Sequence, residues 1–130
     1  MGEVLTTPDV ESVAVAYLRS ALGVLADKVA TKVPATMPAR MVRVSLTGGS
    51  RSNLITDRVQ LTVECWADDE PTASNLARKA HAHMHAAAGA ITNGVWIRAV
   101  SEAGGVQFFP DPDTSKPRYQ FTIRWSVRPT

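Results

Sequence analysis

The stretch DRVQLTVECWADDEPTASNLA, residues 57–77, changes its hydrophobic period halfway along and decides the fold class. Apolar and polar residues first alternate, which predicts a strand buried on one face. Its inward side chains are Val59, Leu61, Val63 and Cys65, and its outward side chains are Arg58, Gln60, Thr62 and Glu64. After the acidic turn ADDEP, Pro71 can open a helix whose apolar stripe is Ala73, Leu76, Ala77, Ala80, Met84 and Ala87. A strand followed at once by an amphipathic helix indicates a fold with both element types.

Residues 8–22 predict an earlier helix, because apolar side chains recur there at helical spacing. Thr7 can cap its free backbone N–H groups, and Pro8 suits the first helical position, where no N–H is needed. Gly23 can end the helix. The two helices therefore lie on either side of the first strands in the chain.

The remaining strands are predicted from shorter alternating runs. They cover residues 40–47, 95–102 and 118–128, with a further short strand possible over 28–33. GGSRSN at 48–53 predicts a flexible hairpin tip, and the glycine- and proline-rich segment 102–117 predicts a long loop. In the last strand the apolar side is Tyr119, Phe121, Ile123, Trp125 and Val127. The order α-β-β-α-β-β predicts a single α+β domain over residues 1–130, with two helices packed on one face of an antiparallel or mixed sheet.

The composition narrows the class of protein. A chain of 130 residues with 45% hydrophobic residues can bury one compact core. Its N-terminus, MGEVLTTPDVE, carries acids where a secretory signal carries basic residues, so we expect a protein kept in the cytoplasm or packed into something assembled there. The single cysteine, Cys65, is expected to be a small buried hydrophobe.

The histidine-rich run HAHMH, residues 81–85, raises the question of a metal site. On a helix His81 and His85 share one flank, while His83 points to the other side. The HExxH zinc motif needs a glutamate between its histidines and a further ligand, and neither is visible here. The sequence therefore predicts no native metal site, and binding of nickel to the pair would be adventitious.

No enzymatic motif is found elsewhere. Asp111 and Asp113 lie in PDPD, where acidic residues more often shape turns than act as acid and base. Gly48 and Gly49 precede a hairpin tip rather than a helix, so they form no phosphate cradle, and P-loop, GxGxxG and GxSxG motifs are missing. We expect no catalytic residue and no cofactor.

Basic residues and two aromatic residues are the candidates for contact with partners. Arg40, Arg43, Arg51 and Arg58 are accompanied by one acid, Asp57, and a second basic run consists of Lys116, Arg118, Arg124 and Arg128. These residues form either a solvated charged face or a contact surface. Phe108 and Phe109 either plug the core or dock on another surface.

Over nearly its full length the sequence resembles the tail terminator proteins of long-tailed phages of actinobacteria. The resemblance runs through PDVESVAVAYL, TKVP, PARMVRVSLTGG, DRVQLTVECWADDEPTASNLA and PDPDTSKPRYQFTIRWSVR. It implies an α/β subunit of a hexameric ring that caps the head-proximal end of the tail tube, stops its polymerisation and offers a joining surface for the head connector. The implied partners are copies of the chain itself, the major tail tube protein, the connector or stopper protein, and DNA that passes through the lumen without sequence-specific binding. The implied location is the virion, assembled in the host cytoplasm, with no membrane contact.

A head-to-tail ring brings two different patches of neighbouring subunits together. The candidate interface residues are Arg40, Arg43, Arg51, Arg58, Phe108, Phe109, Asp111, Asp113, Lys116 and Arg118. Two alternatives stay open: another neck protein, such as a stopper or head completion ring, and a basic nucleic-acid-binding module suggested by the arginines and a pI near 9.0. Against the second, the basic positions alternate with threonine, serine and glutamine rather than with exposed aromatic residues.

Overall fold

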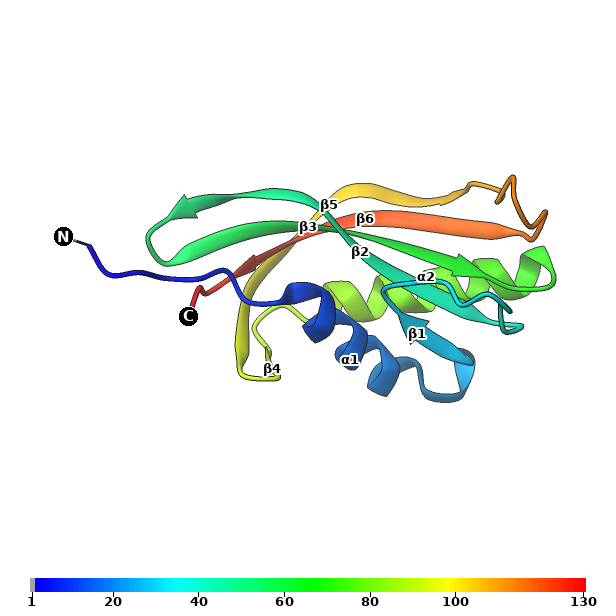
Figure 1. Ribbon diagram of the computed structural model, residues 1–130, viewed down its shortest axis with the longest axis horizontal. Helices are drawn as coiled ribbons and strands as arrows, with labels where there is room; N and C mark the ends of the chain where they lie inside the picture. The colour runs from blue at the N-terminus through cyan, green and yellow to red at the C-terminus, as the bar shows by residue number, and fades with distance from the viewer. Residues whose placement is uncertain (1) are drawn as a thin grey trace.

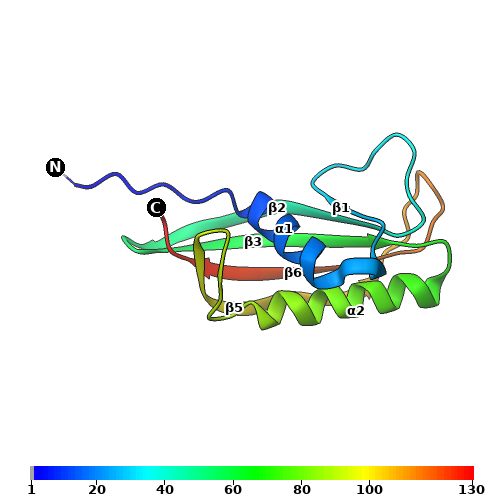
Figure 2. The ribbon, with the colours of Figure 1, turned by 90° about the horizontal axis from the view of Figure 1, so that it is seen from below.

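The computed structural model describes residues 2–130 and consists of a long twisted sheet with both helices on one face (Figures 1 and 2). The elements are α1 (Val10–Leu22), η1 (Gly23–Leu25), β1 (Lys28–Ala30), β2 (Met41–Asn53), β3 (Thr56–Trp66), α2 (Glu70–Ala86), β4 (Ile91–Thr92), β5 (Val95–Phe108) and β6 (Arg118–Val127). The strand order is β1-β2-β3-β6-β5-β4, with β1 parallel to β2 and the other neighbours antiparallel. The predicted α+β class with two helices on one face is confirmed. We call the opposite face of the sheet the open face.

The core lies between the helices and the sheet. Every residue of the predicted α2 stripe is buried, as are the predicted inward side chains of β3. On β6 the buried inward side chains are Phe121, Ile123, Trp125 and Val127. The Trp125 indole donates to the Met84 carbonyl at 3.2 Å, and the Tyr17 hydroxyl donates to the His83 carbonyl at 2.6 Å. Hydrogen bonds therefore join α2 to β6 and α1 to α2. Cys65 is a buried thiol whose pKa is raised by that burial and by the neighbouring Glu64 carboxylate.

The start of α1 differs from the prediction. Asp9 is the N-cap, and its carboxylate accepts a hydrogen bond from the Ser12 amide at 3.3 Å. Thr7 instead donates to the Asp57 carboxylate at 2.7 Å, far along the chain. A sequence that offers Thr7 and Asp9 two positions apart has two possible caps, and the tertiary contact of Thr7 decides between them. Gly23 ends the helix with φ of 53°, as predicted.

The β2–β3 hairpin is longer than predicted, so the assignment of 48–53 to a flexible tip was wrong. Pairing continues to Asn53, and the turn is at Leu54 and Ile55. A register shift between Leu46 and Gly48 carries the backbone through a bulge. At Gly49, φ is 139° and an added Cβ would lie 2.2 Å from the carbonyl oxygen of Arg58. Gly49 therefore permits close strand pairing rather than a loop.

The second half of β5 was also missed, because residues 103–108 continue the strand that was predicted to end at 102. Register shifts against β6 occur after Ile97, after Glu102 and after Gly104. Each shift breaks the alternation by which a strand is recognised in sequence. The loop between β5 and β6 covers only residues 109–117, and Phe108 belongs to the strand.

Candidate interaction surfaces

The middle of the open face carries short hydroxyl side chains. Thr47, Thr62 and Thr122 lie side by side on β2, β3 and β6, with hydroxyl oxygens 3.1 Å apart in each neighbouring pair. Cross-strand threonine pairs of this kind stabilise a sheet whose surface faces solvent. The open face is thus polar at its centre.

At one end, Trp66 lies on the open face and is nevertheless only 1% exposed. The guanidinium carbons of Arg43 and Arg118 are each 5.5 Å from its ring centroid. Both arginines also donate to the Glu64 carboxylate, Arg43 at 2.6 and 2.8 Å and Arg118 at 3.0 Å. One buried carboxylate therefore compensates two arginines while they cover the indole.

Asp111 closes this arrangement from the loop that follows β5. It is buried, and its carboxylate accepts hydrogen bonds from the Trp66 indole, the Asp113 amide and the Thr114 hydroxyl, each at 3.0 Å. Burial opposes its ionisation, but the three hydrogen bonds and nearby Arg118 outweigh burial and hold the pKa of Asp111 below its ordinary value. We name Trp66, Glu64, Arg43, Arg118 and Asp111 the Trp66 cluster.

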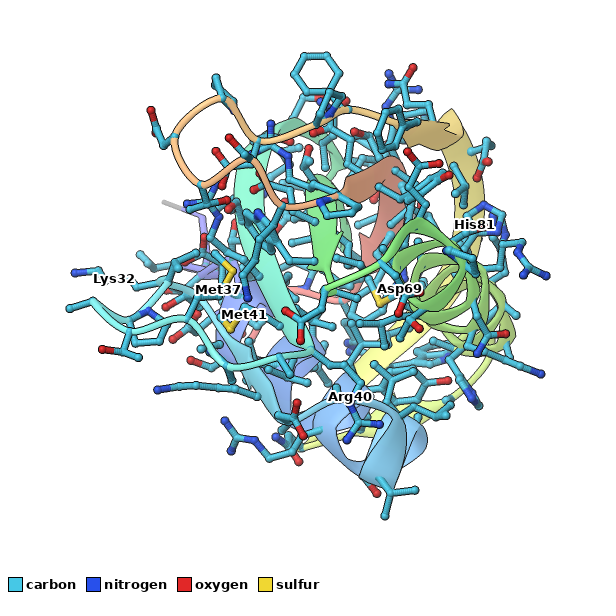
Figure 3. The ribbon with its side chains drawn as sticks, turned by 90° about the vertical axis from the view of Figure 1, so that its right-hand side faces the viewer. Lys32, Met37, Arg40, Met41, Asp69 and His81 are labelled. Carbon is cyan, nitrogen blue, oxygen red and sulfur yellow. The ribbon has the colours of Figure 1, made fainter. Side chains whose placement is uncertain are left out.

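A small pocket adjoins the Trp66 cluster at the end of the sheet shown in Figure 3. Its volume is about 210 Å³, and Val33 and Met37 from the β1–β2 connection form one side. Its other lining residues belong to the Trp66 cluster or to the 109–117 loop. Most of the polar groups around it are already engaged with one another, which makes it a seam between packed segments rather than a prepared ligand site.

Phe108 and Phe109, which we name the aromatic edge, are 46% and 51% exposed. The Phe108 ring lies 5.1 Å from that of Tyr119, and the Arg118 guanidinium lies 5.4 Å from the centre of the Phe109 ring. The interpretation that one of them plugs the core is therefore wrong. Each ring packs against one neighbouring side chain and exposes its other side to solvent.

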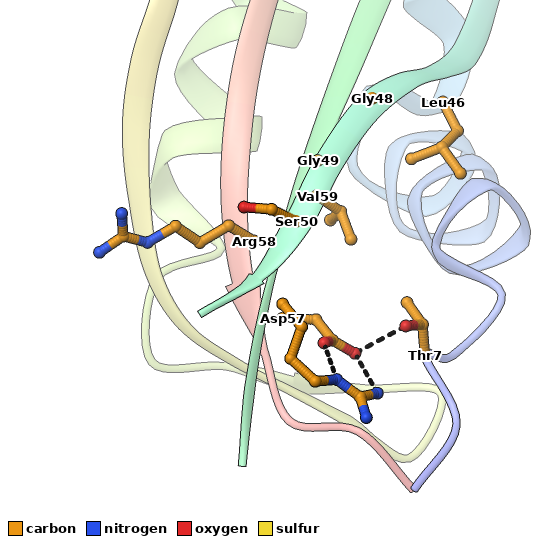
Figure 4. Close-up of a pocket in the computed structure, with 9 residues that line it drawn as sticks. Thr7, Leu46, Gly48, Gly49, Ser50, Asp57, Arg58 and Val59 are labelled. Atoms are coloured by element: carbon orange, nitrogen blue, oxygen red, sulfur yellow. Dashed lines mark hydrogen bonds and ion pairs between the residues drawn. The ribbon is translucent and has the colours of Figure 1, made fainter. Parts of the chain in front are cut away.

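At the opposite end, the β2–β3 hairpin forms an open groove with the chain segment before α1 (Figure 4). Arg51 donates to the Asp57 carboxylate at 2.7 and 3.2 Å and to the Leu5 carbonyl at 3.0 Å, while Thr7 donates to Asp57 from the other side. The Arg51 hydrogen bond is the main cause that holds the pKa of Asp57 below its ordinary value, against the effect of burial. The groove has a volume of about 520 Å³ and is lined by Thr7, Leu46, Gly48, Gly49, Ser50, Arg51, Asp57, Arg58 and Val59. We name it the hairpin groove.

The charged candidate interface residues thus fall into two groups, according to whether a group of opposite charge within the chain pairs with them. Arg40 pairs with Asp27 at 2.8 Å, and Lys116 pairs with Asp68 at 3.0 Å, in addition to the pairs already described. Arg58 is exposed, and no carboxylate among residues 2–130 lies within ion-pairing distance of it. The roles of these residues as contacts with other proteins stay predictions. Glu64 and Trp66 were not predicted as members of a site, although Glu64 stands directly opposite Arg43 in the hairpin register.

The helical histidine pair has an acidic neighbour that the sequence did not reveal. Glu102 of β5 lies against both rings, with one carboxylate oxygen 2.8 Å from His81 Nε2 and the other 2.7 Å from His85 Nε2. The expectation of a histidine pair without a further potential ligand is therefore wrong. Burial disfavours the charged form of Glu102, but hydrogen bonds with His85 and His81 outweigh it and lower the pKa of its carboxyl group.

Comparisons with known proteins give a likeness in structure alone. No protein-family model matches the sequence. No curated protein matches it either. A solved structure described as the virion of a native gene transfer agent particle contains a similar chain, with 15% identity, a TM-score of 0.59, and coverage of 91% of this chain and 93% of that one. At this identity the likeness shows a shared fold. Among the described residues, no helix has the length and apolar character needed to span a membrane.

Proposed function

We propose that the chain is a structural component of a phage or phage-like virion, and that its role there is that of a tail terminator. The observation that carries the proposal is the agreement in fold, over nearly the whole of both chains, with a chain from a gene transfer agent virion. The sequence resemblance to tail terminators supports the finer assignment. In this role the chain forms a hexameric ring on the head-proximal end of the tail tube.

A tube of stacked rings grows for as long as its end offers the interface that each added ring buries. A terminator ring ends growth because it binds that face and presents a different one. We propose that the outward face of the ring joins the connector or stopper protein of the head, and that DNA passes through the lumen without sequence-specific contact. This function requires neither a catalytic group nor a cofactor.

The ring contact itself is proposed to join the aromatic edge of one subunit to the hairpin groove of the next. A head-to-tail ring needs two unlike patches that lie apart on the subunit. The turn of the hairpin and the 109–117 loop lie at opposite ends of the long sheet (Figure 1). The aromatic edge offers two half-exposed rings, and the groove offers an open concave surface lined in part by Leu46 and Val59. Aromatic side chains seated in a pocket are typical of energetically important contacts.

Purified chain added to polymerising tail tube protein tests the terminator role. We expect six-subunit rings in negative stain and tubes whose mean length falls as the chain is added. A matched preparation carrying Phe109→Ser should leave tube length unchanged. Tubes that grow to the same length with and without the wild-type chain would contradict the proposal. If the chain then still bound the head connector, the result would favour the stopper alternative.

A further inference from the structure

The three groups His81, His85 and Glu102 converge on one point at the flank of α2 that faces β5 (His81 is labelled in Figure 3). One ligand atom from each residue can be chosen so that all three lie within 4.8 Å of one another. We propose that these residues bind one divalent transition-metal ion of the zinc class, with a remaining coordination position open to solvent.

The fold explains why the residues meet. His81 and His85 are one helical turn apart, so their rings leave α2 on the same flank, with centroids 4.6 Å apart. Glu102 stands opposite Ile123 in the β5–β6 register, and Ile123 is buried in the core beneath the helices. Register partners in an antiparallel pair point to the same face, so Glu102 is directed toward α2.

Neighbouring residues restrict the geometry of the site. The His81 ring meets the buried Phe121 ring edge to face, with centroids 5.0 Å apart and planes at 86°. An added Cβ at Gly105 would lie 3.4 Å from a carboxylate oxygen of Glu102, which is ordinary contact distance, so this carboxylate lies close to the β5 backbone. A bulge directly after Glu102 shifts the register of β5 against β6 at this point. A site restrained by packing on a helix and a strand needs little rearrangement to accept an ion.

The separations between the histidine nitrogens and the Glu102 carboxylate are close to those of a metal site. The distances from the two Nε2 atoms to the carboxylate oxygens are 2.7–3.0 Å. Ligands held tetrahedrally at the usual zinc bond lengths lie about 3.3 Å apart, so each histidine nitrogen must move away from the carboxylate by a few tenths of an ångström. The two histidine ligand atoms, which lie within 4.8 Å of each other, must take up the same spacing. Two imidazoles and one carboxylate favour zinc, cobalt or nickel over calcium or magnesium, which prefer all-oxygen sites. His83, on the opposite flank of the helix, takes no part.

Titration of the metal-free chain with zinc tests the site. The chain should be prepared without a histidine tag and stripped with EDTA, and binding followed by calorimetry, with Co²⁺ as the spectroscopic substitute. We expect one ion per chain, the visible absorption bands of a low-coordinate cobalt ion, and a melting temperature that rises with zinc concentration. His81→Ala, His85→Ala and Glu102→Gln should each weaken zinc binding by at least about tenfold. His83→Ala, in the same run of sequence, should bind as tightly as the wild type.

Glu102→Gln separates a built site from adventitious binding, because it keeps the side-chain shape and both histidines. If zinc bound this variant as tightly as the wild type, the histidine pair alone would be the binding group and the proposal would be wrong. Absence of saturable binding by the wild type at millimolar zinc, or an equal loss in His83→Ala, would overturn it as well. These measurements use the isolated chain, so their outcome is independent of the proposed role in the virion.

Discussion

Both ends of the sheet carry arginines and apolar groups on a surface that no helix covers. The two ends differ in how these groups are packed and paired. In the Trp66 cluster two arginines cover a fully buried indole, and Glu64 compensates both. At the hairpin end Arg51 is paired with Asp57, but Arg58 projects freely and Leu54 is 78% exposed. At the first end the arginines and the indole are paired and buried within one subunit. The second end leaves a charged and an apolar side chain exposed, as at a surface that contacts a partner.

This difference shows why a cluster of arginines in a sequence is weak evidence for a contact surface. Arg43 and Arg118 were predicted at an interface, yet in the structure each makes a charged hydrogen bond and a contact with Trp66 inside the chain. Their strands carry few acids nearby in sequence, and the compensating Glu64 comes from the neighbouring strand. The uncompensated Arg58 and the aromatic edge are the better candidates for contact with another protein.

The largest expected effect of a single substitution is that of Trp66→Ala. Removing this buried indole leaves a cavity and exposes the paired arginines, so the free energy of unfolding should fall by about 3–5 kcal/mol in urea denaturation. Trp96→Ala is the matched control, because Trp96 is 40% exposed and contacts Arg98 at the edge of β5. It should cost about 1 kcal/mol or less. Equal losses in the two variants would show that the Trp66 cluster is no more tightly packed than the surface.

Acid should weaken both ends together, because each carries a buried aspartate. Asp57 and Asp111 both have a pKa below the ordinary value of an aspartate, which is about 4. The carboxylate forms therefore stabilise the fold fully above that ordinary pKa, and the contribution is lost as the pH falls below it toward the folded-state pKa. Asp57→Asn and Asp111→Asn should each flatten the decline of stability between about pH 5 and pH 2. An unchanged slope in either variant would remove that aspartate from the account of acid sensitivity.

A smaller loss of stability is expected from the double variant Phe108→Ser and Phe109→Ser. The two rings are about half-exposed and contact Tyr119 and Arg118 from one side only, so unfolding should become easier by about 1–2 kcal/mol. Circular dichroism should show a folded chain, while sizing should show loss of the ring and of binding to the tube. An unfolded double variant would mean that these residues are part of the core after all.

The smallest effect on the monomer is expected at the tip of the hairpin. Leu54→Ser with Ile55→Ser replaces apolar side chains that are 78% and 49% exposed, so the free energy of unfolding should change by no more than about 0.5 kcal/mol. If the hairpin contacts a neighbouring subunit or the tube, sizing should nevertheless show weaker assembly. A variant that assembles as well as the wild type would remove the tip from the proposed contact.

The sequence predicted those parts of the fold in which burial imposes a period. The inward residues of β3 and the α2 stripe were predicted correctly because one face of each element is buried throughout. The far halves of β2 and β5 were missed because their side chains are mostly exposed and bulges interrupt the alternation. Glu64 and Glu102 were missed for another reason: each acts through a residue on a different element, and such pairings depend on register and helix placement.

Tail length in a phage that lacks the gene for this chain tests the terminator role most directly. A tube whose growing face is never covered should keep adding rings, since each addition buries the same interface again. We therefore expect electron micrographs of such lysates to show tails of excessive and variable length that are not joined to heads. Re-expression of the wild-type chain should restore uniform, joined tails. Free tails of uniform, normal length would contradict the terminator role and favour a stopper or head completion protein.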